Sequence, residues 1–246
     1  MQIYSALQIG EYHLNNCEDY LFTHNIGDNK LLCAVMDGCT MGVDSYFVST
    51  LTGKLLRKIA RQFDHLEFYK KGVPGDINDN LKTILKELFK ELKQARNQLM
   101  LEERELLTTL IILLVDVRED KGVLQAIGDG VVGINGELKE FEQDNKPDYI
   151  GYYLNEDFDD WYSRQTQKIF INSINDISIA TDGITTFARV KKAEIAEGID
   201  PVLYMVNDSV VLMAEDSLQR KLKTLEHVYG LKPTDDLAMI RIVNNN

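Results

Sequence analysis

Apolar residues recur every three or four positions in two long stretches of the first half of the chain. The first stretch runs from Val48 to Phe63 and predicts an amphipathic helix that begins near residues 44–45. The second predicts a longer helix, with Asp76 as its N-cap after the Pro74–Gly75 turn. Its apolar stripe consists of Ile77, Leu81, Ile84, Leu85, Leu88, Leu92, Ala95 and Leu99.

Short aliphatic runs elsewhere in the chain predict β-strands. The most aliphatic of them are 31–36, 106–117, 122–128 and 176–181. Residues 237–243 alternate with a period of two, and the Asn135–Gly136 pair within 133–141 suits a tight hairpin turn. Two more helices are expected at about 191–199 and 208–228. This order of elements predicts an α+β domain of sheets covered by helices rather than a regular parallel α/β repeat.

The composition is that of a globular protein, because 44% of the 246 residues are hydrophobic. Length alone allows one large domain or two small ones. No internal repeat, low-complexity tract or flexible linker divides the chain, so we expect a single domain over residues 1–246. One irregular segment, 143–165, carries Trp161, four tyrosines and six acidic residues. It is either a mobile functional loop or an insertion whose aromatic residues cover the edge of the core.

The chain carries 39 acidic against 27 basic residues, which gives a formal net charge of −12. This excess of acid argues against binding to nucleic-acid phosphates or to anionic lipid, since both attract basic proteins. No apolar run reaches the roughly 18 residues of a membrane span, and the N-terminal residues lack the pattern of a secretory signal. The three cysteines, Cys17, Cys33 and Cys39, form no CxxC motif. We therefore expect a reduced, cytoplasmic protein.

Aspartate follows three of the aliphatic runs, each time with glycine behind it. The pairs are Asp37–Gly38, Asp129–Gly130 and Asp182–Gly183. Two acidic pairs, Glu18–Asp19 and Asp235–Asp236, stand directly before strand-like runs. A single Asp-Gly pair usually marks a turn. Three of them at strand ends, together with two acidic pairs, indicate more than turns, because an aspartate at a strand end is rigidly placed and open to solvent.

Convergence of these strand ends would bring five or six carboxylates together. Like charges at such short range cannot all stay ionised without compensation, and no basic residue is placed in the sequence to neutralise them. Divalent cations would do so, and a ligand set made only of oxygen favours Mg²⁺, Mn²⁺ or Ca²⁺ over Zn²⁺. The pattern therefore predicts a binding site for hard divalent cations.

The acidic motifs also follow one another in the order found in a known enzyme family. They are NCEDYL, AVMDGCTMG, a strand with two adjacent threonines, AIGDG, IATDGITTF and PTDDLAMI, and they extend from Glu18 to Ile240. With these motifs the chain resembles the metal-dependent type 2C serine/threonine protein phosphatases, and in particular their divergent bacterial branch. The resemblance implies a central β-sandwich of two antiparallel sheets flanked by helix pairs, which agrees with the predicted order of elements.

The resemblance also implies a role for each acidic motif. Asp37 resembles the aspartate that bridges two metal ions, with the carbonyl of Gly38 as a further ligand. Asp182 and Asp235 resemble the other ligands of the first ion. Asp19 lies on the side of the second ion, where the family commonly binds through water. The implied cofactors are two Mg²⁺ or Mn²⁺ ions, which would generate a bridging hydroxide that attacks phosphorus in line.

Three further acidic residues have secondary roles in this resemblance. Glu18 is expected to support Asp19, and Asp129 together with Asp182 matches a third, weaker metal site of bacterial members. Asp236 stands where the family often has asparagine, so it is treated as secondary. No covalent phosphoenzyme is required by this mechanism, and the cysteines show no Cys-x5-Arg loop of the cysteine-dependent phosphatases.

Three positions depart from the pattern of the family. The arginine that grips the substrate phosphate is absent, and Leu14 occupies its place. His13 beside it is either a phosphate contact or a plain surface histidine. Cys39 follows the first Asp-Gly pair where some members have a histidine, and the glycine-rich loop after it keeps only Gly42. These departures bear on how phosphate is held and leave the predicted metal cluster intact.

The leading expectation is the metal-dependent hydrolysis of phosphoserine and phosphothreonine in proteins, with a phosphoprotein substrate and a cognate kinase as partners. Two alternatives stay open: a weak or inactive regulatory module of the same fold that binds a protein partner, and a phosphatase of a small phosphate ester. Segment 143–165 falls where family members carry a mobile flap beside the active site. Its six acidic residues would disfavour acidic phosphopeptides and tolerate basic ones.

Overall fold

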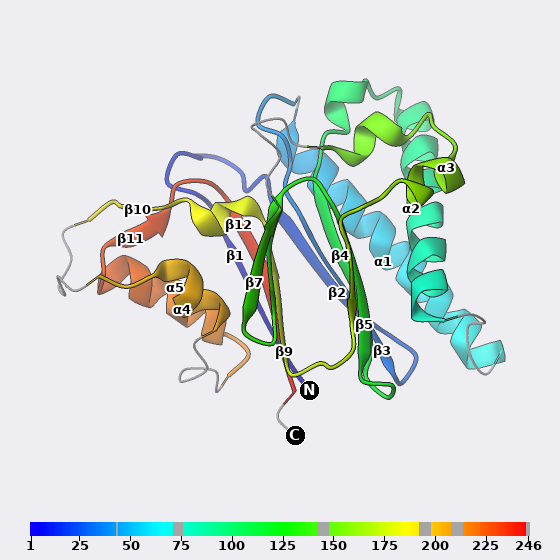
Figure 1. The fold of residues 1–246 in the computed structure, drawn as a ribbon. Helices are drawn as coiled ribbons and strands as arrows, with labels where there is room; N and C mark the ends of the chain where they lie inside the picture. Colours follow the sequence, from blue (N-terminus) through cyan, green and yellow to red (C-terminus); the bar gives the residue numbers. More distant parts are fainter. Residues whose placement is uncertain (43, 71–75, 142–147, 192–197, 208–213, 245–246) are drawn as a thin grey trace.

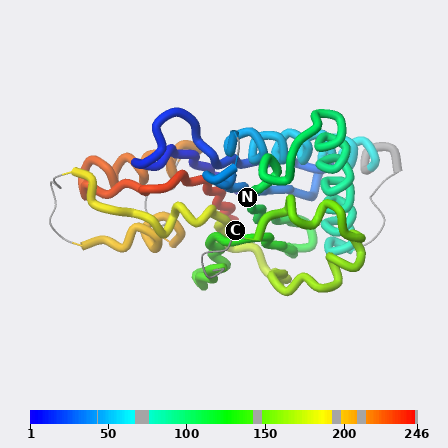
Figure 2. The backbone as a smooth tube through the Cα atoms, turned by 90° about the horizontal axis from the view of Figure 1, so that it is seen from above, coloured from blue at the N-terminus to red at the C-terminus, as the bar shows by residue number. Residues whose placement is uncertain are grey.

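Two antiparallel β-sheets lie face to face, and helices cover the outer face of each sheet (Figure 1). The computed structural model describes residues 1–42, 44–70, 76–141, 148–191, 198–207 and 214–244. Figure 2 shows the two helix pairs on opposite sides of the sheets. This arrangement confirms the expected α+β sandwich flanked by helix pairs.

The first sheet contains five strands in the order β1-β12-β9-β6-β7. They are β1 (Gln2–Gln8), β12 (Leu237–Val243), β9 (Asp176–Ala180), β6 (Gly130–Ile134) and β7 (Glu137–Phe141). In the β1–β12 pair, Gln2 lies opposite Val243 and Gln8 lies opposite Leu237. The first and last strands of the chain are therefore neighbours, which brings the segments beyond Gln8 and before Leu237 to the same end of the sheet.

The second sheet contains five strands in the order β2-β3-β4-β5-β8. They are β2 (Tyr20–Ile26), β3 (Lys30–Met36), β4 (Leu110–Asp116), β5 (Lys121–Ile127) and β8 (Lys168–Ile171). On β3, Leu31, Cys33 and Val35 face the other sheet, whereas the residues between them face the helices. Because both faces are covered, the strand is aliphatic throughout and shows no alternation.

The helices divide between the outer faces of the two sheets. On the second sheet lie α1 (Ser45–Lys70) and α2 (Ile77–Leu99), and on the first lie α4 (Pro201–Val206) and α5 (Ser217–His227). Shorter elements are η1 (Glu103–Glu105), η2 (Ile150–Tyr153), α3 (Phe158–Ser163), η3 (Asp182–Thr185) and the two-stranded ribbon β10 (Phe187–Arg189) and β11 (Leu231–Pro233). In the described part of the chain, no helix is both long and apolar enough to cross a membrane.

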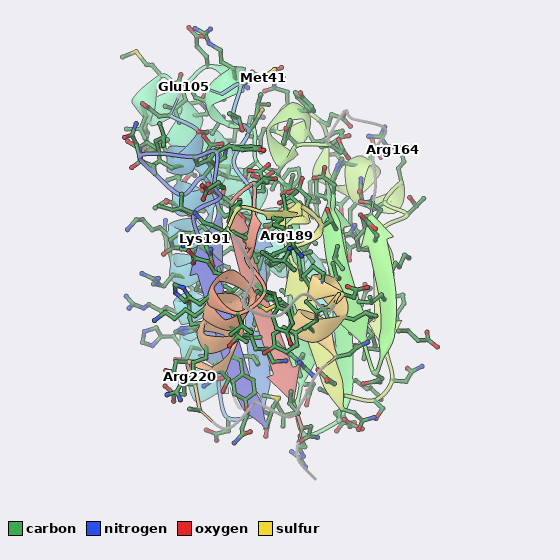
Figure 3. All side chains as sticks on the ribbon, turned by 90° about the vertical axis from the view of Figure 1, so that its left-hand side faces the viewer. Met41, Glu105, Arg164, Arg189, Lys191 and Arg220 are labelled. Carbon is green, nitrogen blue, oxygen red and sulfur yellow. The ribbon has the colours of Figure 1, made fainter. Side chains whose placement is uncertain are left out.

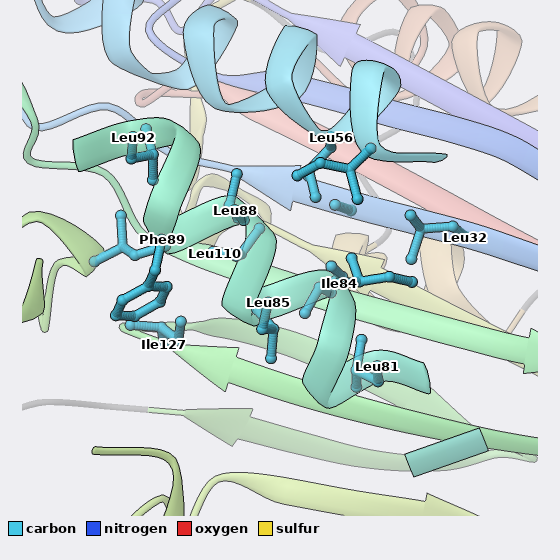
Figure 4. Packing of buried hydrophobic residues seen from close by; sticks show 14 of the residues in the cluster. Leu32, Leu56, Leu81, Ile84, Leu85, Leu88, Phe89, Leu92, Leu110 and Ile127 are labelled. Atoms are coloured by element: carbon cyan, nitrogen blue, oxygen red, sulfur yellow. The ribbon is translucent and has the colours of Figure 1, made fainter. Parts of the chain in front are cut away.

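Helix α2 forms where its apolar stripe predicts it. The side chain of Asp76 accepts a hydrogen bond from the Asp79 N–H at 2.8 Å, which confirms the expected N-cap. Figure 4 shows the buried stripe of α2 against the second sheet and α1. Each fully buried leucine of this stripe contributes about 1.5–3 kcal/mol to stability. The stripe includes Leu81, Ile84, Leu85, Leu88, Phe89 and Leu92.

The strand predicted at 237–243 is confirmed as β12, but both of its faces are buried. Ala238, Ile240 and Ile242 lie between the two sheets. Arg241 is 0% exposed, and its Nε donates to Asp176 Oδ1 at 2.9 Å. This ion pair satisfies a guanidinium that burial would otherwise make costly, so a charged residue occupies a position that the alternating pattern assigns to solvent.

Other sequence predictions have mixed outcomes. The hairpin turn is confirmed, with positive φ values of 52° at Asn135 and 93° at Gly136. The helix predicted at 208–228 is present from Ser217 to His227, and its first six residues lie outside the described residues. Most of the helix predicted at 191–199 also lies outside them. The strand-like run after Asp19 is confirmed as β2. Strands β1 and β8 and helix α4 were not predicted, because they are short or carry polar residues on one face.

Segment 143–165 is packed against the core over its described part, residues 148–165. Trp161 is 1% exposed, and its ring centroid lies 4.5 Å from that of Phe89 on α2. Phe158 contacts the same two rings. These contacts favour the interpretation in which the aromatic residues cover the edge of the core. Residues 143–147 of this prediction lie outside the described residues.

Candidate active site

Acidic residues from five separate segments gather at one end of the sandwich. They are Asp19 before β2, Asp37 after β3, Asp129 between β5 and β6, Asp182 at the start of η3, and Asp235 before β12. Pairing of Tyr20 with Met36 sets Asp19 and Asp37 next to each other. This is the end of the molecule where Met41 and Glu105 are labelled in Figure 3. The structure therefore brings together the aspartates that the sequence singled out.

Close backbone contacts at three glycines make this convergence possible. A Cβ on Gly38 would lie 2.1 Å from the Ser45 carbonyl oxygen, at the start of α1. A Cβ on Gly183 would lie 1.8 Å from the carbonyl oxygen of Asp236, and one on Gly10 would lie 2.3 Å from the carbonyl carbon of Asp235. No side chain fits at such distances, so glycine is required wherever these segments meet.

The backbone of Asp37 is held by two adjacent threonines that directly precede β4. Thr108 Oγ1 donates to the Asp37 carbonyl oxygen at 2.7 Å, and the Thr109 N–H donates to the same oxygen at 2.9 Å. The Asp37 N–H in turn donates to Thr109 Oγ1 at 3.1 Å. With its backbone groups satisfied in this way, Asp37 directs its carboxylate to the cluster from a rigid base.

Asp19 is a buried acid with one hydroxyl partner. It is 3% exposed, and Thr181 Oγ1 donates to its Oδ2 at 2.5 Å. The Thr181 hydroxyl also accepts the Ala238 N–H at 2.9 Å, which ties Asp19 to β12. Burial raises the pKa of Asp19 to about 8, although hydrogen bonds from Thr181 and Asp37 favour the ionised form.

The other acids of the cluster are perturbed in the same direction. Burial first, and then the charges of Asp19 and Asp182, raise the pKa of Asp37 well above its usual range. Burial and the charges of Asp129 and Asp235 raise the pKa of Asp182 to about 7. The cluster therefore holds protons at neutral pH unless a positive charge takes their place.

Asp236 ties together the loop between β1 and β2. Its carboxylate accepts the Gly10 N–H at 2.7 Å and the Glu18 N–H at 2.5 Å. His13 Nδ1 lies 2.9 Å from Asp236 Oδ2, and His13 Nε2 lies 3.5 Å from Asp235 Oδ1. Although the sequence suggested a secondary role for Asp236, it positions the loop that carries Asp19.

The interpretation of His13 as a plain surface histidine is wrong. Its side chain is 17% exposed, and both ring nitrogens face carboxylates. Burial lowers its pKa, but the hydrogen bond to Asp236 and the charges of Asp236, Asp235 and Glu18 outweigh burial, so the pKa is raised. The imidazole therefore compensates acidic charge within the site, and its contact with phosphate stays a prediction.

Glu18 joins the same loop to α1. Its carboxylate accepts Thr40 Oγ1 at 2.9 Å and Ser45 Oγ at 2.5 Å. Its carbonyl oxygen accepts the Gly38 N–H at 3.2 Å, directly beside Asp37. Glu18 thus holds the loop that carries Asp19 against the Asp37–Gly38 turn and α1, through its backbone and through these hydroxyl groups. Its expected support of Asp19 stays a prediction. Leu14, at the position of the missing arginine, is 89% exposed.

The donor set of the cluster fits a hard divalent cation, because it consists of carboxylate and carbonyl oxygens. Within the described residues, His13 is the one basic side chain that pairs with these acids. In the same part of the chain, no three acidic, histidine or cysteine side chains already surround one point as metal ligands do. Binding of an ion therefore requires these side chains to change position. This is expected, because carboxylates without a cation between them repel one another.

A comparison with protein families identifies the chain. The family described as protein phosphatase 2C matches residues 9–225. The chain belongs to this family. Proteins of the protein phosphatase 2C family are metal-dependent phosphatases, so the coarse function predicted from the motifs is confirmed. No curated protein matches the sequence.

Solved structures of protein phosphatase 2C domains share the fold. A bacterial serine phosphatase has a TM-score of 0.61 and 12% sequence identity, with 100% of each chain covered. RsbX, determined in complex with magnesium, has a TM-score of 0.54 and 15% identity, with 98% of this chain and 93% of the other covered. The SiaA-PP2C domain of Pseudomonas aeruginosa has a TM-score of 0.59 and 14% identity, with 99% and 86% covered.

Several residues that organise this phosphatase site were not singled out from the sequence. Thr181 donates to Asp19. Burial, a hydrogen bond with Cys39 and the charge of nearby Asp37 raise the pKa of Tyr149. Thr108 and Thr109 were noted only as a motif. The sequence offered one signal for Thr181, its place directly before the Asp182–Gly183 pair. Its hydrogen bond with Asp19 joins distant segments and leaves no local pattern.

Proposed function

We propose that this chain is an Mg²⁺- or Mn²⁺-dependent phosphatase of phosphoserine and phosphothreonine in proteins. The observation that carries the proposal is the gathering of aspartates with raised pKa values around a site where, among the described residues, only His13 compensates their charge. Such a cluster is stable in its ionised form when cations occupy it. Membership of the protein phosphatase 2C family supplies the reaction class.

The residues divide into three candidate ligand groups. Asp37, Gly38, Asp182 and Asp235 would hold a first ion, and Asp37 with Asp19 would hold a second. Asp129, whose pKa is raised by burial, would hold a third and weaker one together with Asp182. When bound, these ions supply an activated water and stabilise charge on the phosphoryl oxygens.

The remaining polar residues of the site position those ligands. Thr108 and Thr109 fix the backbone of Asp37, and Thr181 orients the carboxylate of Asp19. Glu18 and Asp236 hold the β1–β2 loop against α1 and β12. Substitution of these residues is therefore expected to weaken metal affinity through the geometry of the ligands.

Binding of the phosphate ester is the weak element of this site. Leu14 carries no charge, and both nitrogens of His13 face carboxylates. We therefore expect a high KM for small phosphate esters. The same observation favours a second candidate, a regulatory module of the same fold that binds a protein partner with little or no turnover.

Hydrolysis of p-nitrophenyl phosphate, with and without Mn²⁺, tests the proposal. The comparison uses the wild type, Asp37→Asn, and Asp28→Asn as a matched control. Asp28 is exposed in the turn at the opposite end of the β2–β3 hairpin. We expect Mn²⁺-dependent turnover in the wild type and the control, and a loss of at least about 100-fold in Asp37→Asn, because each ion would lose a shared ligand.

Calorimetric titration with Mn²⁺ separates the two candidates. A folded wild type that binds Mn²⁺ but hydrolyses neither p-nitrophenyl phosphate nor a phosphopeptide would support the regulatory module. A folded wild type that binds no divalent ion would refute both the metal site and the enzyme.

A further inference from the structure

Helix α1 presents a line of exposed basic side chains on an otherwise acidic protein. Lys54, Arg57 and Arg61 are spaced three and four residues apart, so they lie on one face of the helix. All three are exposed, and we call them the basic stripe. Tyr46 and His65, also exposed, extend the same line towards the two ends of the helix. The formal charge of the whole chain is −12, which makes this concentration of positive charge unusual for the molecule.

Acidic partners for the basic stripe are missing within the part of the chain that the structure describes. Arg57 Nη2 donates to the Tyr20 hydroxyl at 3.3 Å, and none of the three residues forms an ion pair. Lys58, beside the stripe, does pair with Glu91 at 2.6 Å. The nearest acid on α1, Asp64, is engaged by the Gly27 N–H at 3.0 Å.

Two lysines on α2, unlike the residues of the basic stripe, have an acidic partner. Lys82 and Lys86 both pair with Asp159 at 2.6 Å, and Asp159 belongs to the acidic segment 148–165. Other acids of that segment are also engaged locally, since Asp157 caps α3 and Glu156 pairs with Arg164. Two acids of this segment, Glu156 and Asp159, are thus compensated by basic side chains within the protein, whereas the positive charge of the basic stripe is not compensated by any described acid.

Helix α1, which carries the basic stripe, starts at the candidate active site. Ser45, the first residue of α1, touches Gly38 through its carbonyl oxygen and donates its hydroxyl to Glu18. Tyr46 lines an open cavity of about 390 Å³ together with His13 and Glu18. A polypeptide that leaves this cavity over Tyr46 would therefore run onto the basic stripe.

We propose that the basic stripe binds an acidic segment of the protein substrate. The proposal rests on the proposed phosphatase function and names a class of substrate for it. Helical rise places Lys54 about 12 Å and Arg61 about 22 Å beyond Tyr46. An extended chain covers these distances in about four to seven residues. The acidic residues of the substrate would accordingly lie about four to seven positions from the residue that contacts Tyr46.

The test compares three peptides that share one phosphoserine core. One carries a run of glutamates beginning four residues from the phosphoserine, in versions extended on either side, and the others carry glutamine or lysine in the same positions. The protein variants are the stripe triple variant Lys54→Glu/Arg57→Glu/Arg61→Glu and a control, Lys93→Glu/Arg118→Glu/Lys223→Glu. The control changes the net charge equally at exposed residues outside α1.

We expect the stripe variant to raise KM for the glutamate peptide roughly tenfold, as the loss of three exposed charge pairs would give. The kcat for that peptide, the KM for the glutamine peptide and the hydrolysis of p-nitrophenyl phosphate should not change. In the control variant, all of these parameters should remain at the wild-type level. Equal KM values for the glutamate peptide in the two triple variants would overturn the proposal.

A binding measurement keeps the proposal testable without turnover. Fluorescence anisotropy of a labelled, unphosphorylated hexaglutamate peptide, added to protein in chelator, should show salt-sensitive binding that the stripe variant loses and the control keeps. Preferential binding of an RNA oligonucleotide or of anionic vesicles would assign the surface to another partner and overturn the proposal. Absence of turnover in every variant, with hexaglutamate binding intact, would refute the phosphatase function and leave the stripe as a peptide-binding surface.

Discussion

Removal of divalent cations should make the stability of this protein fall as the pH rises from about 5 to about 8. Asp182 has an ordinary pKa of 3.8, and in the fold burial and the charges of Asp129 and Asp235 raise it to about 7. Between these values the folded protein binds more protons than the unfolded chain. The free energy of unfolding therefore decreases as the pH increases through this interval.

The size of the effect follows from the same values. From pH 5 to the pKa of about 7 in the fold is about two units, which correspond to about 3 kcal/mol at 1.4 kcal/mol for each unit. For a chain of this size that is a decrease in Tm of roughly 10 °C. Asp19 and Asp37 act in the same direction, because their pKa values are also raised. His13 does so too, since stabilisation by its raised pKa is present at low pH and is lost as the pH rises through that pKa.

Thermal unfolding, followed by circular dichroism, measures this directly. The protein is melted at pH 5 and pH 8 in chelator and again at pH 8 with Mg²⁺, which should restore most of the lost Tm by favouring the ionised carboxylates. Asp182→Asn should reduce the decrease between the two pH values by about 3 kcal/mol, and Asp28→Asn should not affect it. A Tm in chelator that stays constant or rises from pH 5 to pH 8 would refute the reasoning.

Two further substitutions test the support of the site and the packing of segment 148–165. Thr181→Val keeps the shape of the side chain but leaves Asp19 and the Ala238 N–H without their hydroxyl partner. Urea unfolding should show that the free energy of unfolding falls by about 2–3 kcal/mol, and Thr181→Ser should keep the wild-type value. An unchanged urea midpoint in the valine variant would contradict this role. Trp161→Ala should lower the free energy of unfolding by about 3–5 kcal/mol. Phe170→Ala, at an aromatic residue that is 61% exposed, should change it little. A Trp161→Ala variant of normal stability but altered turnover would show that the segment acts as a flap instead.

The local sequence pattern was sufficient to predict elements that bury either one face or both faces. Helix α2 has one apolar stripe and a polar face, so its extent and its Asp76 cap were readable from spacing and residue type. The aliphatic strand β3 was equally clear, because the other sheet and the helices cover both of its faces. The strand predicted at 106–117 forms only from Leu110 to Asp116 as β4. Strand β8 has only four residues and exposes Phe170, so its local pattern is too short to distinguish it from a loop.

The positions of the acidic motifs along the sequence determined which aspartates belong to the candidate site, because each Asp-Gly pair follows an aliphatic run. Only the tertiary structure decided which of these acids are engaged by backbone groups of distant segments. Asp235 and Asp236 are neighbours in sequence, yet Asp236 accepts the N–H of Gly10 from 226 residues away, while Asp235 stays half-exposed beside His13. The role of each of these two carboxylates depends on the segment that packs against it, here the chain after β1. The pairing of β1 with β12 places that segment there, and no local sequence pattern does.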